Sequence, residues 1–154
     1  MDRCWSRRET LRALGFLATS LAVPSWLPGC RTGGTPTPPE IAYDRDTCDW
    51  CHMTIDAPQL AAAFVPASGR AQRFGEPGCL LSWLATQSAP AGVAFVAVQE
   101  DGSWLKAEHA SFVRGTVRTP MRFDLVAWRN PPDGVSTVDW PALRREGKPN
   151  AHQI

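Results

Sequence analysis

The clearest secondary-structure pattern of the chain lies in residues 60–98, LAAAFVPASGRAQRFGEPGCLLSWLATQSAPAGVAFVAV. Leu60–Val65 is a compact apolar run, and the turn-forming residues Pro66–Gly69 end it. Ala71–Phe74 then resumes with the alternating polarity of a half-buried strand. Two short runs of this kind joined by a turn predict a β-hairpin.

The segment after the hairpin has helical character. Pro77 suits the first position of a helix. The backbone N–H at that position has no partner within the helix, so proline loses no hydrogen bond by lacking it. Apolar side chains then recur at helical spacing through Ser88, namely at Cys79, Leu80, Trp83 and Leu84. Val93–Val98 is rich in β-forming residues and predicts a third strand. The whole unit is therefore expected to run strand, strand, helix, strand.

The second half of the chain repeats this pattern more weakly. We expect a short strand at Trp104–Lys106, a turn or two of helix at Ala107–Val113 and another strand at Arg122–Trp128. Residues 138–147 predict a short helix with Pro141 in its first turn. The sequence thus predicts an α+β fold in which two small ββαβ-type modules pack as one compact domain.

The start of the chain has the layout of an export signal. Arg7 and Arg8 form a twin-arginine pair in a basic head, and a mildly apolar run follows at residues 14–23. That run is shorter than the roughly 20 residues that span a bilayer, so no transmembrane helix is expected. Leu27-Pro28-Gly29-Cys30 resembles a bacterial lipobox, whose cysteine takes the lipid. We predict a twin-arginine-type lipoprotein signal peptide at residues 1–29, with cleavage by a general signal peptidase as the alternative.

Three further regions follow the predicted signal peptide. Residues 30–43 begin with the lipidated Cys30 and form a stalk rich in Pro, Gly and Thr, residues 44–147 form the folded domain, and residues 148–154 form a loose tail. The mature part holds 12 basic and 13 acidic residues, because the signal peptide carries four of the 16 basic and two of the 15 acidic ones. This balance, without a basic run, gives no support to nucleic-acid binding. The protein is expected to be anchored to a membrane by its lipid and to face the periplasm or extracytoplasmic space.

The most informative motif for chemistry is Cys48-Asp49-Trp50-Cys51-His52-Met53. It places two thiols, an imidazole and a thioether within six residues, where no apolar periodicity requires them. These are soft or borderline donors, which suit Cu(I) better than calcium, magnesium or manganese. Zinc would accept cysteine and histidine but gains nothing from methionine. We expect Cys51 and Met53 to bind Cu(I), with a further donor from His52, Cys79 or Met121.

Other interpretations of the same motif remain open at this point. Cys48-x-x-Cys51-His52 is also the attachment pattern of c-type haem, with Met121 available as the second axial ligand, and this would make the protein a small cytochrome. A Cys-x-x-Cys thiol oxidoreductase is another alternative, although such a pair usually opens a helix. A plain disulfide between Cys48 and Cys51, with Cys79 buried and inert, is the simplest structural explanation.

Three motifs in order resemble the NosL family, lipoprotein accessory proteins of nitrous oxide reductase. They are Asp46-x-Cys48-Asp49-Trp50-Cys51-His52-Met53-Thr54-Ile55, Phe74-x-x-x-Gly78-Cys79-Leu80-Leu81-x-Trp83 and Thr119-Pro120-Met121. The resemblance spans about residues 46–128. The family often has glycine at the position of His52 and commonly has an acidic pair where this chain has Gly75 and Glu76. Further departures fall at Leu80, Arg122 and Phe123.

The resemblance implies a Cu(I)-binding copper chaperone that is not an enzyme. Such a protein would supply copper for maturation of nitrous oxide reductase, or of a related cuproenzyme, in denitrification. Carried over by position, Cys51 and Met53 match the family's thiol and thioether, and Cys48, Cys79 and Met121 fall on its other sulfur positions. The expected partners are a copper-dependent reductase and its assembly machinery, and the chain is expected to be a monomer or a weak dimer.

The remaining polar candidates have simpler explanations. His109 is expected to be a surface or capping residue, and His152 lies in the predicted loose tail. The first motif is acidic, and its carboxylates either face solvent or help to attract a cation; they belong to Asp44, Asp46, Asp49 and Asp56. No Gly-rich phosphate loop and no paired catalytic carboxylates stand out.

Overall fold

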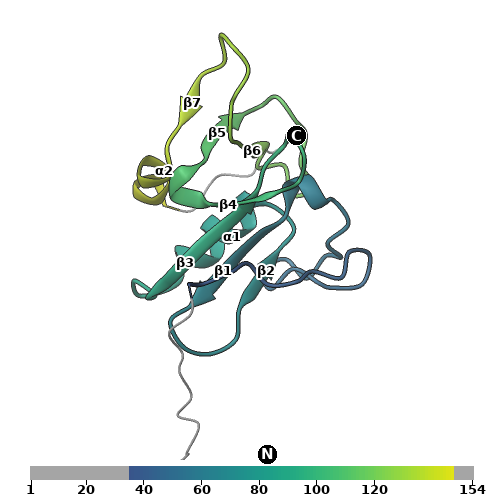
Figure 1. The fold of residues 1–154 in the computed structure, drawn as a ribbon, viewed down its shortest axis with the longest axis vertical. Coiled ribbons are helices and arrows are strands. Elements are labelled where there is room, and N and C mark those ends of the chain that lie inside the picture. The colour runs from purple at the N-terminus through teal and green to yellow at the C-terminus, as the bar shows by residue number, and fades with distance from the viewer. Residues whose placement is uncertain (1–34, 148–154) are drawn as a thin grey trace, which may run out of the picture. The chain divides into compact units, whose positions relative to one another are not determined.

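The computed structural model describes residues 35–147, and its larger sheet has four antiparallel strands in the order β2-β1-β3-β4 (Figure 1). These strands are β1 (Ala62–Pro66), β2 (Gln72–Phe74), β3 (Gly92–Ala97) and β4 (Trp104–Lys106). Ala62 pairs with Phe74 across the hairpin, and Phe64 pairs with Ala94 on the other side of β1. The predicted hairpin and the predicted third strand are therefore confirmed.

A smaller sheet of three strands, in the order β6-β5-β7, completes the domain. Its strands are β5 (Ser111–Arg114), β6 (Leu125–Trp128) and β7 (Thr137–Val138). A parallel bridge joins Val98 to Ala127, and the Gln99 N–H donates to the Ala127 carbonyl at 2.8 Å, so the chain leaving β3 is tied to β6. One hydrophobic core draws large buried side chains from both sheets and from the helix between them, among them Phe74, Leu80, Phe112 and Leu125.

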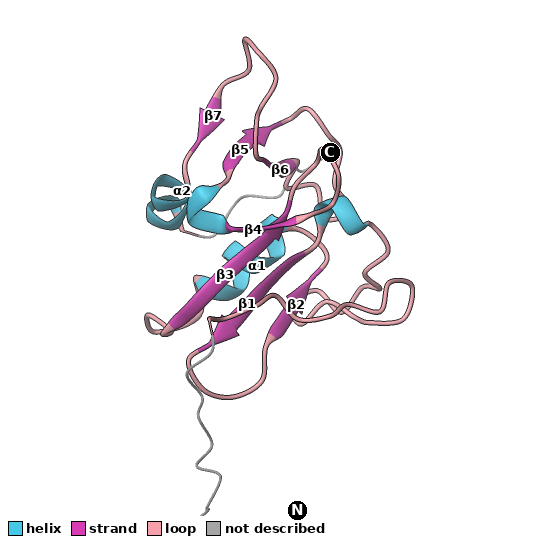
Figure 2. Cartoon of the chain, viewed as in Figure 1, coloured by secondary structure: helices cyan, strands magenta, loops and turns pink. Residues whose placement is uncertain are grey.

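Helix α1 (Pro77–Leu84) contacts β1 and β2 of the larger sheet and β6 of the smaller one, and Figure 2 shows it lying behind the strands. Pro77 stands in its first turn, as predicted. Trp83 packs its ring against those of Phe64 and Phe74, with centroids 5.3 and 5.7 Å away. The helix ends four residues before the predicted Ser88, because residues 85–88 are exposed and offer the core no apolar side chain.

The second half keeps the α+β character but orders its elements differently from the prediction. The helix expected at Ala107–Val113 is one 3-10 turn, η2 (Ala107–His109), and its C-terminal part belongs to β5. The strand expected from Arg122 begins only at Leu125, because Arg122 and Asp124 have positive φ angles of 58° and 47° that a strand cannot accommodate. The α+β class and the compact packing of two small units are confirmed, with the second helix placed after the last strand.

That second helix, α2 (Trp140–Glu146), is the terminal helix that the sequence predicted. The Asp139 side chain accepts a hydrogen bond from the Ala142 N–H at 2.8 Å, and Gly147 ends the helix with a φ of 78°. At the other end of the described chain, Ile41 is buried in the core, so packing begins slightly before the predicted domain boundary at residue 44. None of the helices among residues 35–147 is long and apolar enough to cross a membrane.

Candidate metal centre

The first motif folds into a tight loop that brings Cys48 and Met53 together. Thr47 and Thr54 form an antiparallel bridge at its base, and the Cys48 N–H donates to the Met53 carbonyl at 2.8 Å. Inside the loop, the His52 N–H donates to the Cys48 carbonyl at 3.0 Å. The six-residue motif is therefore a short hairpin-like turn with its sulfur atoms near one another, and no helix begins at its Cys-x-x-Cys pair.

His52 has a left-handed backbone within this loop. Its φ is 62°, a conformation that glycine adopts freely and that costs most other residues energy. The His52 side chain is exposed and is not among the residues that line the cavity described below.

Carboxylates of the first motif attach the loop to β2. The Arg73 N–H donates to Asp49 Oδ2 at 2.7 Å, and the Asp49 N–H donates to the Arg73 carbonyl at 2.8 Å. Asp49 also pairs with Arg70 at 3.2 Å, and Asp46 lies 3.6 Å from the Arg73 guanidinium. Asp46 and Asp49 thus have structural partners, and Asp56 is the one carboxylate of the acidic first motif that lines the cavity described below.

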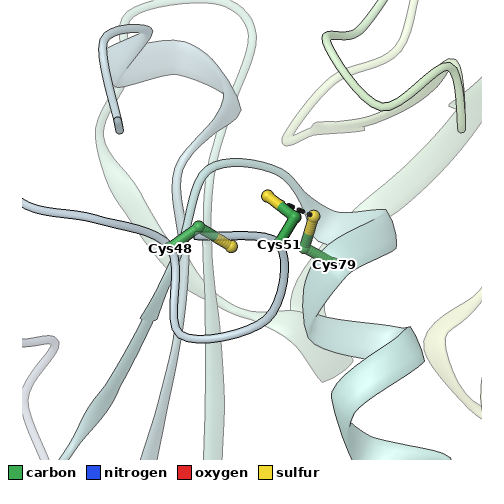
Figure 3. Close-up of side chains that lie close together, drawn as sticks. All are labelled: Cys48, Cys51 and Cys79. Atoms are coloured by element: carbon green, nitrogen blue, oxygen red, sulfur yellow. Dashed lines mark hydrogen bonds between the residues drawn. The ribbon is translucent and has the colours of Figure 1, made fainter. Parts of the chain in front are cut away.

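Cys79, in the first turn of α1, completes a group of three thiols. The Sγ atoms of Cys48, Cys51 and Cys79 all lie within 4.8 Å of one another. Figure 3 shows the three side chains gathered between the loop and the start of the helix. The Cys79 and Cys51 sulfurs are 3.8 Å apart. All three are free thiols in the structure, and Cys48 and Cys79 are buried. The helix and the loop therefore present three soft donors at the spacing that one metal ion needs.

The three thiols differ in acidity because they share one small space. A hydrogen bond from Cys79, aided by backbone N–H groups, lowers the pKa of Cys48 to about 5. Burial raises the pKa of Cys51, and the hydrogen bond to Cys48, together with burial, raises that of Cys79. Like charges at this distance repel, so one negative charge concentrates on Cys48 while its two neighbours keep their protons.

The turn at residues 119–124 supplies the last predicted sulfur ligand, Met121. Thr119 and Asp124 hold this turn closed, because the Thr119 N–H donates to Asp124 Oδ1 at 2.9 Å and the Asp124 N–H donates to Thr119 Oγ1 at 3.0 Å. The Met121 N–H donates to Glu76 Oε1 at 2.7 Å. Glu76 immediately precedes α1, so this bond ties the third motif to the helix that carries Cys79.

One cavity collects these side chains, and we call it the sulfur cavity. Its volume is about 10 Å³, which is roughly the space of a single water-sized sphere. Five of the six predicted metal ligands are among its lining residues, the exception being His52. The full lining consists of Cys48, Cys51, Met53, Thr54, Asp56, Gly75, Glu76, Cys79, Pro120 and Met121. Three thiols and two thioethers are thus among the lining residues, and the three thiols could hold a metal ion.

Glu76 is a member of this site that the sequence prediction did not single out. It is buried, with 1% of its surface exposed, and desolvation raises its pKa. The sequence signal that could have revealed it is the acidic residue just before Pro77 and three residues before Cys79. Sequence alone does not predict its burial, because a carboxylate beside an apolar helix is expected to face solvent.

The geometry bears on the alternatives for the Cys-x-x-Cys motif. A covalent haem needs room for a porphyrin beside Cys48, and this thiol instead faces a cavity of about 10 Å³ together with Cys79. A Cys-x-x-Cys oxidoreductase usually has its pair at the start of a helix, whereas this pair lies in a loop. The arrangement of donors therefore favours a metal over either alternative.

Other predicted positions lie away from the cavity or outside the described residues. His109 is exposed on η2, with its Nε2 3.9 Å from Glu108, as expected of a surface residue. Arg7, Arg8, Cys30 and His152 fall outside residues 35–147. The predicted signal peptide, lipidation site and loose tail consequently remain sequence-based predictions.

No protein-family model matches this chain, and comparisons with curated proteins and with solved structures find no match either. What the molecule does is therefore inferred from the sulfur cavity and from the motifs that build it.

Proposed function

We propose that this protein is a membrane-anchored, extracytoplasmic Cu(I)-binding accessory protein that acts as a copper chaperone. The observation that carries the proposal is the cluster of three thiols within 4.8 Å of one another, beside two thioethers in one cavity. Cysteine and methionine are the soft ligands that select Cu(I) over the hard cations. A zinc site would be expected to use histidine or a fourth cysteine, and His52 is not among the cavity residues.

The unequal exposure of the ligands supports a role in transfer rather than storage. Cys48 and Cys79 are buried, Cys51 is half-buried, and Met53 has 47% of its surface exposed. An incoming ligand from a client protein would meet the Met53 thioether first. Because a thioether is neutral, its displacement leaves the charge of the thiolate ligands in place. Copper can then leave by stepwise exchange that begins at Met53.

The place of action and the recipient come from the sequence. The twin-arginine pair at Arg7 and Arg8 and the lipobox ending at Cys30 support export and attachment to a membrane by a lipid. Resemblance to the NosL family supports nitrous oxide reductase, or a related copper-dependent reductase with its assembly machinery, as the recipient. Each of these assignments is part of the proposal.

The direct test is a Cu(I) titration of the exported protein, purified reduced and without oxygen, in competition with a chromophoric Cu(I) chelator. We expect one Cu(I) per chain and a copper X-ray absorption spectrum dominated by sulfur neighbours. Cys51→Ser and Met53→Leu should each lower the Cu(I) affinity, by at least the roughly 10- to 100-fold loss typical of groups that only orient a ligand.

His52→Asn is the matched control within the same loop. Asparagine tolerates the left-handed backbone that His52 adopts, so the loop should keep its shape while the imidazole is lost. We expect its Cu(I) affinity to equal that of the unchanged protein. Unchanged binding in both Cys51→Ser and Met53→Leu would refute the ligand assignment, and a red protein with covalent haem would identify a cytochrome instead.

A further inference from the structure

Glu76 is the only acidic or basic residue among the fully buried side chains of residues 35–147. Its Oε1 accepts the Met121 N–H, while Oε2 is buried and has no hydrogen-bond partner within the described part of the chain. Burying a polar atom without a partner costs roughly 1–3 kcal/mol. A residue retained at such a cost is expected to do something that an apolar residue cannot.

The position of Glu76 indicates what that role is. It is the N-cap residue of α1, three positions before Cys79, and its carboxylate reaches across to the turn at residues 119–124. Met121 is separated from Glu76 by 45 residues along the chain, yet this hydrogen bond fixes its backbone at the sulfur cavity. The turn at residues 119–124 belongs to no strand, since β6 begins only at Leu125.

We propose that Glu76 is a positioning residue, which holds Met121 at the sulfur cavity through its hydrogen bond to the Met121 N–H and so makes this thioether a ligand for the copper cargo. The proposal rests on the proposed Cu(I)-binding function and adds a residue to it. Glu76 acts through Met121 and is not itself a ligand. A carboxylate oxygen is a hard donor that suits Mg²⁺ or Ca²⁺ better than Cu(I).

Three substitutions separate the hydrogen bond from charge and volume. Glu76→Gln keeps an oxygen that can accept the Met121 N–H, Glu76→Asp keeps the carboxyl group but shortens the reach by one methylene, and Glu76→Leu fills the space without an acceptor. We expect Glu76→Gln to retain Cu(I) affinity. Glu76→Asp and Glu76→Leu should weaken it by the roughly 10- to 100-fold that follows loss of a group orienting a metal ligand.

A double-mutant cycle tests whether Glu76 acts through Met121. If it does, Glu76→Leu should weaken Cu(I) binding in the unchanged protein but add little to the loss already caused by Met121→Leu. Additive losses would show that Glu76 acts by another route and would overturn the proposal.

A readout without copper keeps this inference separate from the proposed function. With ¹³C-methyl-labelled methionine, the Met121 methyl signal of the metal-free protein should shift in Glu76→Asp and Glu76→Leu but not in Glu76→Gln. The exposed Met53 methyl serves as the internal control and should not move. If the methyl signal and the Cu(I) affinity both stay unchanged in Glu76→Asp and Glu76→Leu, the proposal is wrong even though the protein binds copper. If Glu76→Gln behaves like Glu76→Leu, the hydrogen bond is not the cause.

Discussion

At the scale of the single residue, Cys48 carries the charge of the thiol cluster. The Cys79 thiol and the backbone N–H groups around it stabilise the thiolate and lower its pKa to about 5, from an ordinary value of 9.0. A thiolate is the form that binds a metal, so one ligand of the sulfur cavity is ready at neutral pH. Binding of a metal by all three thiols would require Cys51 and Cys79 to release their protons, so we expect metal affinity to fall as the pH falls.

The shifted pKa of Cys48 predicts how stability depends on pH. Between about pH 5 and pH 9 the unfolded chain keeps a proton on this thiol that the folded protein has lost, so this group raises the free energy of unfolding as the pH rises. Its contribution is complete above the ordinary thiol pKa and disappears as the pH falls through about 5. Thiolate absorbance in the ultraviolet should show one group titrating near pH 5.

Two single substitutions check that assignment. Cys48→Ala should abolish the thiolate signal near pH 5, whereas Cys51→Ala should retain it, because the largest contribution to the Cys48 shift comes from Cys79. A titration curve in which Cys48→Ala keeps the low-pH step would show that another thiol carries the charge.

Of the features of the site, the chemical types of its residues could be predicted best from the sequence. The sulfur donors of the three motifs stand out by type and spacing, and Cys48, Cys79 and Met121 do line one cavity. The orientation of His52 could not be predicted, because it follows from a φ of 62° that only the closed loop imposes. Glu76 could not be predicted either, since its burial depends on a turn 45 residues away.

At the scale of elements, α1 and the turn at residues 119–124 approach each other closely at Gly78. A Cβ placed on Gly78 would lie 2.2 to 2.5 Å from atoms of the Phe123 side chain, nearer than real contacts allow. Phe123 belongs to the same turn as Met121. A glycine in this part of α1 therefore lets the turn pack against the helix and keeps Met121 near Cys79.

This contact predicts the effect of Gly78→Ala. Alanine normally stabilises a helix by about 1 kcal/mol relative to glycine, but overpacking a close contact costs about 1–3 kcal/mol. The collision with Phe123 should therefore make the net change in stability unfavourable. We expect a lower free energy of unfolding in urea and a weaker Cu(I) affinity as the turn moves outward.

Gly75→Ala is the matched control for that substitution. It adds the same methyl group three residues earlier, where no atom lies within 4 Å of the new Cβ. Its free energy of unfolding should stay close to that of the unchanged protein, and stability is the control readout because Gly75 also lines the sulfur cavity. Equal effects of the two substitutions would mean that contact with Phe123 does not position the turn.

Secondary structure was predictable where burial imposes a regular pattern. The hairpin, α1 and β3 place apolar residues against one core at the spacing of a strand or a helix. Their positions agree with the sequence prediction. The run Ala107–Val113 has no such periodicity, and it divides between η2 and β5 because β5 pairs with a strand on each side. β7 has two residues and is too short to leave a pattern in the sequence.

At the scale of the whole molecule, the sulfur cavity is assembled from three segments that are distant in the chain. They are the loop around Cys48, the start of α1, and the turn that carries Met121. A shared core and the bridge between Val98 and Ala127 join the two sheets, so the cavity exists only when both are folded.

This arrangement predicts that Cu(I) stabilises the domain as a unit. At free Cu(I) 100 times its dissociation constant, the free energy of unfolding should rise by about 2.7 kcal/mol. Hydrogen exchange should slow in β1, β3, β5 and β6 together, and Cys51→Ser under the same conditions should show much less protection. Slower exchange limited to the loop around Cys48 would indicate that copper binds there without the rest of the site.

The exposed thioether of Met53 also has a consequence for oxidative damage. Peroxide attacks accessible methionine and adds an oxygen to its sulfur, which turns a soft apolar side chain into a polar sulfoxide. Met53 lies at the surface with 47% exposure, while Met121 is more sheltered. If Met53 hands over the ion as proposed, oxidation of this one side chain would block transfer first, and enzymatic reduction of the sulfoxide would restore it.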